Sequence, residues 1–251
     1  MRSRSTLLSH ILGSNPAIDG YCELHQGYRW RFDLLRQSIA IRRAVGTPLE
    51  GQYRLDKILH NLHGCSPSLL TKIKPFVIFM LRPPAETFAS LYRFGQQKRF
   101  RKRYMNHQKI LHYYCKRLAK LEQISNQDGL QSIYLDSSSL VKETEATLHT
   151  LTNWLALKQP LSPNYASFRY TGTNYKGDTS EHIRSGKVLA QTSKTAHEFP
   201  QDMLDAAQQQ FLTTRAILIE NCSLPHATPD LPAEHNEKTS EISYFPTPTT
   251  Q

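Results

Sequence analysis

A short stretch at the start of the chain combines positive charge with hydroxyl groups, which suits it to binding an anion. It reads Arg2-Ser3-Arg4-Ser5-Thr6-Leu7, and an apolar run typical of a helix follows at once. Where a helix begins, free backbone N–H groups and the positive end of the helix dipole surround one point, to which Ser5 and Thr6 can add hydroxyl donors. The glycine-rich run that ends in Gly-Lys-Ser/Thr is absent. We therefore expect an anion site that is not an ATP-hydrolysing loop.

A second pair of candidate anion ligands lies farther along the chain. Residues 76–81 form a continuous apolar run between Pro75 and Arg82-Pro83-Pro84, which predicts a buried strand with Arg82 at its end. The helix expected over residues 85–97 places Ser90 two turns from its start, where its hydroxyl can share a phosphate with Arg82. The alternative is that Arg82 is only a strand-end charge and that Ser90 packs the helix.

These two motifs together resemble the donor-binding segments of the sulfotransferase family. In that family the turn reads Pro-Arg-Ser-Gly-Ser/Thr-Thr-Leu, and a helix, a proline-bearing turn and a Gly-x-x-Glu segment follow it. In this chain the turn is followed by Ser14-Asn15-Pro16 and Gly20-Tyr21-Cys22-Glu23, and the strand with Arg82 and Ser90 comes later in the same order. Two matched motifs in the right order are more specific than either motif alone.

The resemblance implies a donor, 3′-phosphoadenosine 5′-phosphosulfate (PAPS), and no metal. Arg82 and Ser90 would hold its 3′-phosphate, and Arg2 would neutralise charge on the phosphosulfate. Arg4 stands where the family has glycine, so its side chain would point away from the sulfonate or become an extra anion ligand. The rest of the turn would cradle the 5′ group through Ser3, Ser5, Thr6 and Leu7.

Glu23 and His60 are the other candidate catalytic residues. By its position alone, Glu23 is interpreted as a solvated carboxylate in a loop at residues 20–25, whereas the resemblance makes it the base that takes the acceptor's proton. His60 follows Lys57 in a short strand expected at residues 53–62, with Asn61 next to it. Ligands gather beyond the carboxyl ends of strands in open parallel sheets, so these residues are candidates for the rim of the site, with ordinary packing as the alternative.

Residues 171–188 are rich in glycine and hydroxyl groups. Glycine lets the backbone approach a ligand closely, and a mobile surface loop is the alternative. The resemblance implies that this segment closes over the donor as a lid, with Ser185, Gly186 and Lys187 against the nucleotide.

Strands and helices must alternate to position these groups. The helix expected at residues 28–45 is basic and amphipathic, and its arginines should form a solvated face. Besides the first helix and one that ends near residue 123, we expect strands at 53–62, 76–81 and 132–135 and helices at 28–45, 85–97, 143–157 and 201–220.

The resemblance implies a three-layer α/β/α domain with a central, mostly parallel sheet, of the P-loop nucleoside-triphosphate-hydrolase-like type, over residues 1–224. The family's turn follows a hydrophobic strand, whereas only Met1 precedes it in this sequence. We therefore expect that strand to be missing, because the start is assigned too late or the chain is a fragment, and a truncated, inactive relative stays an alternative. The composition of residues 225–251 predicts a disordered tail.

Basic residues outnumber acidic ones by 31 to 21, which gives a formal net charge of +10 at pH 7. This balance favours anionic partners, including nucleic acid, acidic membrane surfaces and phosphate- or sulfate-bearing small molecules. The run Lys98-Arg99-Phe100-Arg101-Lys102-Arg103 has further aromatic residues close by, as in grooves that bind nucleic acid. A nucleic-acid- or polyanion-binding protein is therefore the alternative to an enzyme, and a solvated helix face is the simplest interpretation of the run.

The four cysteines are widely spaced and indicate neither a zinc site nor a disulfide framework. No apolar run approaches the ~20 residues that cross a bilayer, and the first residues do not resemble a signal peptide. We expect a cytoplasmic enzyme that moves a sulfonate group from PAPS to a hydroxyl or amine of a carbohydrate, lipid or small molecule.

Overall fold

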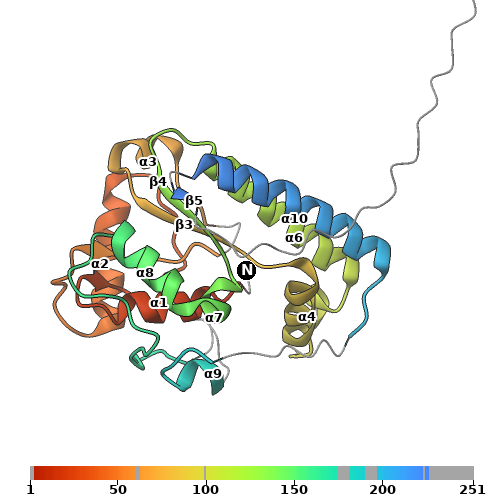
Figure 1. Cartoon of the computed structure of the whole chain (residues 1–251), viewed down its shortest axis with the longest axis horizontal. Helices are drawn as coiled ribbons and strands as arrows, with labels where there is room; N and C mark the ends of the chain where they lie inside the picture. The colour runs from red at the N-terminus through yellow and green to blue at the C-terminus, as the bar shows by residue number, and fades with distance from the viewer. Residues whose placement is uncertain are drawn as a thin grey trace, which may run out of the picture.

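The chain folds into a mixed α/β structure in which short parallel strands form two small sheets (Figure 1). The computed structural model describes residues 3–59, 63–98, 100–173, 181–189, 197–222 and 224–225. The helices are α1 (Ser5–Gly13), α2 (Arg31–Val45), α3 (Pro67–Ile73), α4 (Pro84–Gly95), α5 (Arg101–Tyr104), α6 (His107–Ser125), α7 (Ser139–Lys142), α8 (Thr144–Trp154), α9 (Glu181–Arg184) and α10 (Gln201–Asn221).

The larger sheet contains β3 (Phe76–Leu81), β4 (Gln131–Asp136) and β5 (Leu224–Pro225), all parallel and in that order. β3 and β4 pair along their whole length, and both were predicted from their apolar runs. Because the strands are parallel, the residues that follow β3 and β4 emerge at the same edge of the sheet. Pro225 pairs with β4, although the composition had placed it in the tail, and residues 226–251 lie outside the described part of the chain.

The smaller sheet pairs β1 (Ile18–Asp19) with β2 (Tyr53–Arg54), again in parallel. β2 ends well before residue 62, so the expected strand is wrong beyond Arg54, and β1 is too short to show any alternation of apolar and polar residues. After β1 the chain turns sharply at Gly20, where φ is 112° and an added Cβ atom would lie 2.5 Å from the carbonyl oxygen of Leu55. Only glycine fits at this turn, so the backbone conformation at the start of the loop that carries Glu23 is defined.

Helices pack on both faces of the larger sheet because successive residues of a strand point to opposite sides. Ile133 and Leu135 of β4 pack with apolar residues of α1, α7 and α8. Tyr134 of β4 and Phe79 of β3 pack with apolar residues of α4, α6 and α10. The first group includes the helix that follows the predicted anion-binding turn, so the core holds that turn near the sheet.

The arginines of α2 lie exposed, as expected, but three apolar residues of the helix and the tryptophan before it do so as well. Trp30, Phe32, Leu35 and Ile39 are 72%, 79%, 62% and 44% exposed. The buried residues of α2 are Asp33, Ile41 and Ala44. Only part of the apolar pattern of this helix therefore faces the core.

The helix expected after the basic run, ending near residue 123, is α6, and the short helix α5 precedes it. α5 ends at Tyr104, and α6 begins after Asn106, whose side chain accepts a hydrogen bond of 3.0 Å from the backbone N–H of Lys109. An asparagine cap of this kind starts a new helix. α3, which starts with Pro67 after the capping residue Ser66, was not predicted.

Candidate functional site

The turn before α1 has the backbone conformation of a glycine. Arg4 has φ 58° and ψ 17°, in the left-handed region that residues with a Cβ atom rarely adopt. α1 begins at the next residue, Ser5, and the first backbone N–H groups of a helix have no partners within it. Ser3 and Thr6 are buried beside this helix start.

The side chain of Arg4 reaches two other elements at the edge of the larger sheet. Its Nη1 atom lies 3.3 Å from both the carbonyl oxygen and the Oγ atom of Ser137, which follows β4. Its Nη2 atom lies 3.4 Å from Oε2 of Glu86 in α4. Arg82, which follows β3, donates from Nε to the same Oε2 atom at 2.9 Å. The two predicted anion-binding motifs thus meet at one carboxylate.

Among the described residues, two guanidinium groups share one carboxylate, that of Glu86, so these three side chains together carry a net positive charge. Burial lowers the pKa of Arg4, the nearby charge of Arg82 lowers it further, and Glu86 opposes both effects. The Nε atom of Arg4 is buried and has no hydrogen-bond partner within the described part of the chain. A buried donor of this kind beside excess positive charge suits a bound anion. Ser90 lies one helical turn after Glu86 in α4 and is 9% exposed.

A second group of polar residues contacts the start of α1 through Thr6. The Nζ atom of Lys57 is 3.3 Å from Oγ1 of Thr6, and Lys57 is 8% exposed. Asp56 accepts hydrogen bonds from the backbone N–H groups of Leu24 and Lys57 at 3.0 and 2.7 Å. It also accepts one of 2.5 Å from the hydroxyl of Tyr28. Asp56 therefore ties the loop at residues 20–25 to the segment after β2.

Glu23 is buried within this second group. Burial raises the pKa of Glu23, while the positive charges of His25 and Lys57 act in the opposite direction. The Nδ1 atom of His25 lies 3.5 Å from Oε1 of Glu23. A carboxylate whose pKa lies above its ordinary value is a better proton acceptor, so the site offers a general base close to the turn.

Arg117 of α6 also belongs to this group and was not predicted. Its guanidinium donates to the carbonyl oxygen of Ile58, and its charge interacts with that of Glu23. Burial lowers the pKa of Arg117. The sequence did contain an indication that Arg117 is buried, because this residue falls in the apolar stripe of α6 with Tyr114 and Leu118. A charged residue within such a stripe is buried and needs a polar partner.

The predicted lid residues lie in a turn after α9. The Oγ atom of Ser185 donates to the carbonyl oxygens of His182 and Lys187 at 2.7 and 3.1 Å. Gly186 has φ 70°, and its carbonyl oxygen accepts a hydrogen bond of 2.8 Å from the backbone of Tyr165. Among the described residues, no hydrogen bond or ion pair joins this turn to the cluster at Glu86. Residues 174–180 of the same segment lie outside the described ranges.

Three other predicted residues cannot be placed. Arg2, His60 and Asn61 lie outside the described residues, as does Arg99 of the basic run. Lys98 and Arg101 of that run are exposed, which fits a solvated face.

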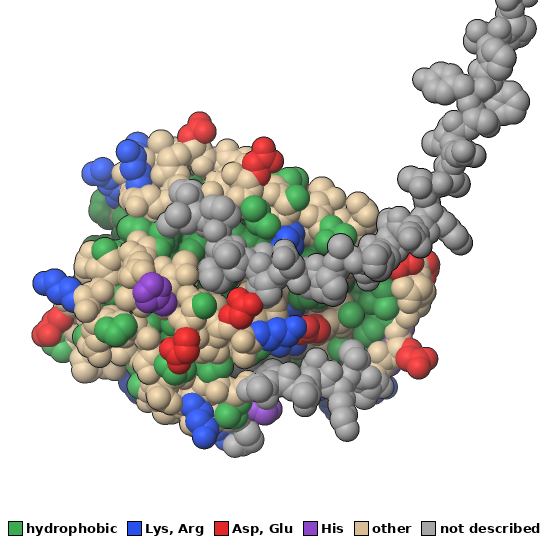
Figure 2. Space-filling model, viewed as in Figure 1, with side chains coloured by type: hydrophobic (Ala, Val, Ile, Leu, Met, Phe, Trp, Pro, Cys, Tyr) green, Lys and Arg blue, Asp and Glu red, His purple; other side chains and the backbone are tan. Residues whose placement is uncertain are grey.

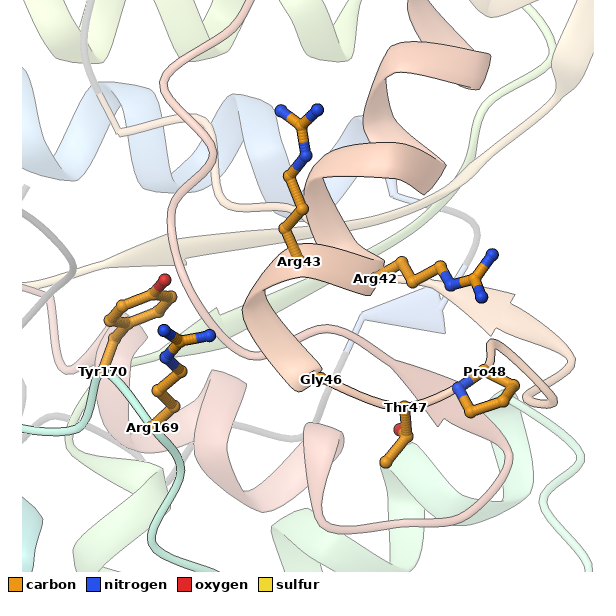
Figure 3. A pocket seen from close by; sticks show the side chains of 7 residues that line it. All are labelled: Arg42, Arg43, Gly46, Thr47, Pro48, Arg169 and Tyr170. Carbon is orange, nitrogen blue, oxygen red and sulfur yellow. The ribbon is translucent and has the colours of Figure 1, made fainter.

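A hollow of about 490 Å³ lies away from the cluster at Glu86, at the end of α2 (Figure 3). Arg42 and Arg43 leave α2 in different directions, and Arg169 comes from a separate loop with its guanidinium 5.3 Å from the ring centre of Tyr170. Gly46, Thr47 and Pro48 complete its lining. None of the predicted site residues that the structure describes lines this hollow.

Comparisons of the chain with protein-family models, with curated proteins and with solved structures gave no match. Within the described ranges, no group of three or more His, Cys, Asp or Glu side chains is arranged to hold a metal ion. Within the same ranges, no helix is both long and apolar enough to cross a membrane.

Proposed function

We propose that this chain is a sulfotransferase that moves a sulfonate group from PAPS to a hydroxyl or amine acceptor. The observation that carries the proposal is the meeting of Arg4 and Arg82 at one carboxylate, Oε2 of Glu86. A donor with anionic groups at both ends needs two binding motifs within the reach of one molecule. The turn before α1 and the residue after β3 support the proposal, because side chains from both contact Glu86.

The fold that we infer for this function is the three-layer sulfotransferase fold. Its support is the packing of helices on both faces of the sheet formed by β3, β4 and β5. A second support is the left-handed conformation of Arg4, at the position where the family has glycine. The candidate site lies beyond the carboxyl ends of parallel strands, where ligands bind in open α/β sheets.

In the proposed reaction Glu23 accepts the proton of the acceptor's hydroxyl or amine. The freed oxygen or nitrogen attacks the sulfur atom, and the bond between sulfur and the bridging oxygen of the 5′-phosphate breaks with its electron pair on that oxygen. Transfers of this kind depend on positioning and on stabilising the charge that develops, more than on covalent help from the protein. In this proposal Lys57, whose Nζ atom lies 3.3 Å from Oγ1 of Thr6, stabilises the leaving oxygen.

Glu86 has a distinct role in this proposal, because it occupies the guanidinium groups that the donor needs. The side chain of Glu86 is 32% exposed, whereas those of Arg4 and Arg82 are each 10% exposed. We infer that a phosphate group of the donor competes with this carboxylate for Arg4 and Arg82. Ser90, one turn later in α4, would then donate to the same phosphate.

Calorimetry with 3′-phosphoadenosine 5′-phosphate and with ATP tests the donor assignment. We expect the phosphoadenosine compound to bind more tightly than ATP, and we expect Arg82→Ala to weaken its binding about tenfold or more, as for loss of a charge-assisted hydrogen bond. Arg93→Ala, an exposed arginine of α4, is the matched control and should leave binding unchanged. Equal binding of both nucleotides, or binding of neither, would contradict the proposal.

A further inference from the structure

The exposed side of α2 has a regular arrangement of apolar and basic residues. At about 100° per residue, Phe32, Leu35 and Ile39 fall within about 60° of the helix circumference. All three are exposed, at 79%, 62% and 44%. They form an outward apolar strip, with Trp30 at the start of the helix and 72% exposed.

Arginines line both edges of this strip. On the same helical projection Arg31 and Arg42 follow one edge, and Arg36 and Arg43 follow the other. Arg36 pairs with Asp33, the acidic residue of α2, at 3.3 Å. Among the described residues, no carboxylate forms an ion pair with the other flanking arginines, Arg31, Arg42 and Arg43.

The hollow at the end of α2 extends this basic surface. Arg42 and Arg43 line it together with Arg169, which is exposed and, among the described residues, likewise forms no ion pair (Figure 3). α2 lies at one edge of the molecule, away from α4 and α10 (Figure 1). Apolar and basic side chains lie next to one another at the edge where α2 and α3 are found (Figure 2).

We propose that α2 binds the surface of an anionic phospholipid bilayer. An apolar strip flanked on both sides by arginines is the arrangement of helices that lie in the plane of a membrane interface. The strip would enter the boundary between headgroups and acyl chains, and the arginine side chains would extend along it to the phosphates. Trp30 has the amphipathic side chain that is enriched at this depth. This surface lies outside the proposed catalytic cluster.

Charge argues against a second copy of the chain as the occupant. Two copies that met through this face would bring their arginine rows together, and Asp33, the acidic residue of α2, already pairs with Arg36 of its own helix. A bilayer also needs no matching groove, so it can accept a strip that projects from a single helix. An anionic lipid surface satisfies both the apolar and the basic residues of α2.

Vesicle binding tests the proposal through the fluorescence of Trp30. The chain contains two tryptophans, so Trp154→Phe leaves Trp30 as the single reporter. With vesicles of phosphatidylglycerol and phosphatidylcholine, we expect the protein to sediment with the lipid and the emission of Trp30 to shift to shorter wavelength. With vesicles of phosphatidylcholine alone, we expect neither result.

Substitutions separate the apolar and basic contributions. Phe32→Glu should weaken binding to the anionic vesicles by about tenfold or more, since it removes a large apolar side chain from the lipid. Arg31→Gln and Arg43→Gln should each weaken it about fivefold. The controls are Leu212→Glu, at an exposed leucine of α10, and Arg101→Gln, at an exposed arginine of α5; both should bind as the unchanged protein does.

Three outcomes would overturn the proposal. The first is equal binding to neutral and anionic vesicles, and the second is a loss of binding in Leu212→Glu as large as that in Phe32→Glu. The third is the absence of vesicle binding together with a dimer, seen by analytical ultracentrifugation, that Phe32→Glu dissociates. The last result would identify a second copy of the chain as the occupant of α2.

Discussion

Arg4 and Arg82 donate to the same oxygen atom, Oε2 of Glu86, at 3.4 and 2.9 Å. One guanidinium comes from the turn that opens α1 and the other from the residue that follows β3. Because both side chains are 10% exposed, their charges are poorly screened, and among the described residues they share one carboxylate. This relationship makes the site suitable for an anionic ligand.

The backbone of Arg4 gives a test that does not depend on activity. Both Arg4→Ala and Arg4→Gly remove the guanidinium, but only glycine adopts a φ of 58° without strain. We expect the glycine variant to have a free energy of unfolding about 1 kcal/mol larger than that of the alanine variant, measured in urea. Lys74, with φ 44° at the end of α3, is the control position. Its glycine variant should likewise have a larger free energy of unfolding than its alanine variant. Equal stability of the two Arg4 variants would mean that the turn has another conformation.

Replacement of Glu86 tests whether its carboxylate competes with the donor. Glu86→Gln keeps the shape of the side chain but removes its charge. Arg4 and Arg82 then lose a competing carboxylate and can bind a phosphate group more strongly. We expect 3′-phosphoadenosine 5′-phosphate to bind about threefold to tenfold more tightly, measured by calorimetry, since charged hydrogen bonds are stronger than neutral ones. Glu145→Gln, at an exposed position of α8, makes the same change of charge elsewhere and should have no effect. Weaker binding in Glu86→Gln would show that the carboxylate positions the arginines and does not compete.

The buried position of Glu23 predicts a particular pH dependence. A base acts only when it is deprotonated, and burial raises the pKa of Glu23. Turnover should therefore rise with pH through a value above about 4.3, the ordinary value for glutamate. Glu23→Gln should abolish turnover and leave the affinity for 3′-phosphoadenosine 5′-phosphate unchanged. Unchanged turnover in this variant would remove Glu23 from the role of base.

Lys57 should influence both the turn and Glu23. Lys57→Met removes the contact with Oγ1 of Thr6 and also removes a positive charge that lowers the pKa of Glu23. We expect turnover to fall about tenfold and its rise with pH to move to higher pH, as the pH profile of the purified variant would show. Lys72→Met, at an exposed lysine of α3, is the control. A profile that stays in place would separate Lys57 from the proposed base.

Some elements follow from the sequence because local patterns define them. The apolar run of β3 and the apolar spacing of α10 determine those elements with little help from the rest of the chain. The segment at residues 20–25 was likewise predicted as a loop. Two-residue strands such as β1 carry no such pattern, since pairing with β2 alone makes them strands.

The site was predictable only in part. The sequence indicated the turn, Arg82 and Glu23 through their motifs, and it indicated Lys57 as a residue near the rim. It did not indicate that Glu86 joins the two arginines, or that Arg117 lies near Glu23, because both contacts connect segments far apart in the chain. Nor did it predict that the strip on α2 faces outward, since an apolar pattern does not specify which surface covers it.

The sequence alone determined the longer helices, the strands β3 and β4, and which residues have the chemistry to bind an anion, because those properties depend on neighbours along the chain. The tertiary structure decided which of these residues lie close together in space. Parallel pairing of β3 with β4 brings Arg82 and Ser137 to one edge of the sheet, and packing of α1 against that sheet brings Arg4 to both. Such proximity depends on strand register and helix packing, which long-range contacts determine.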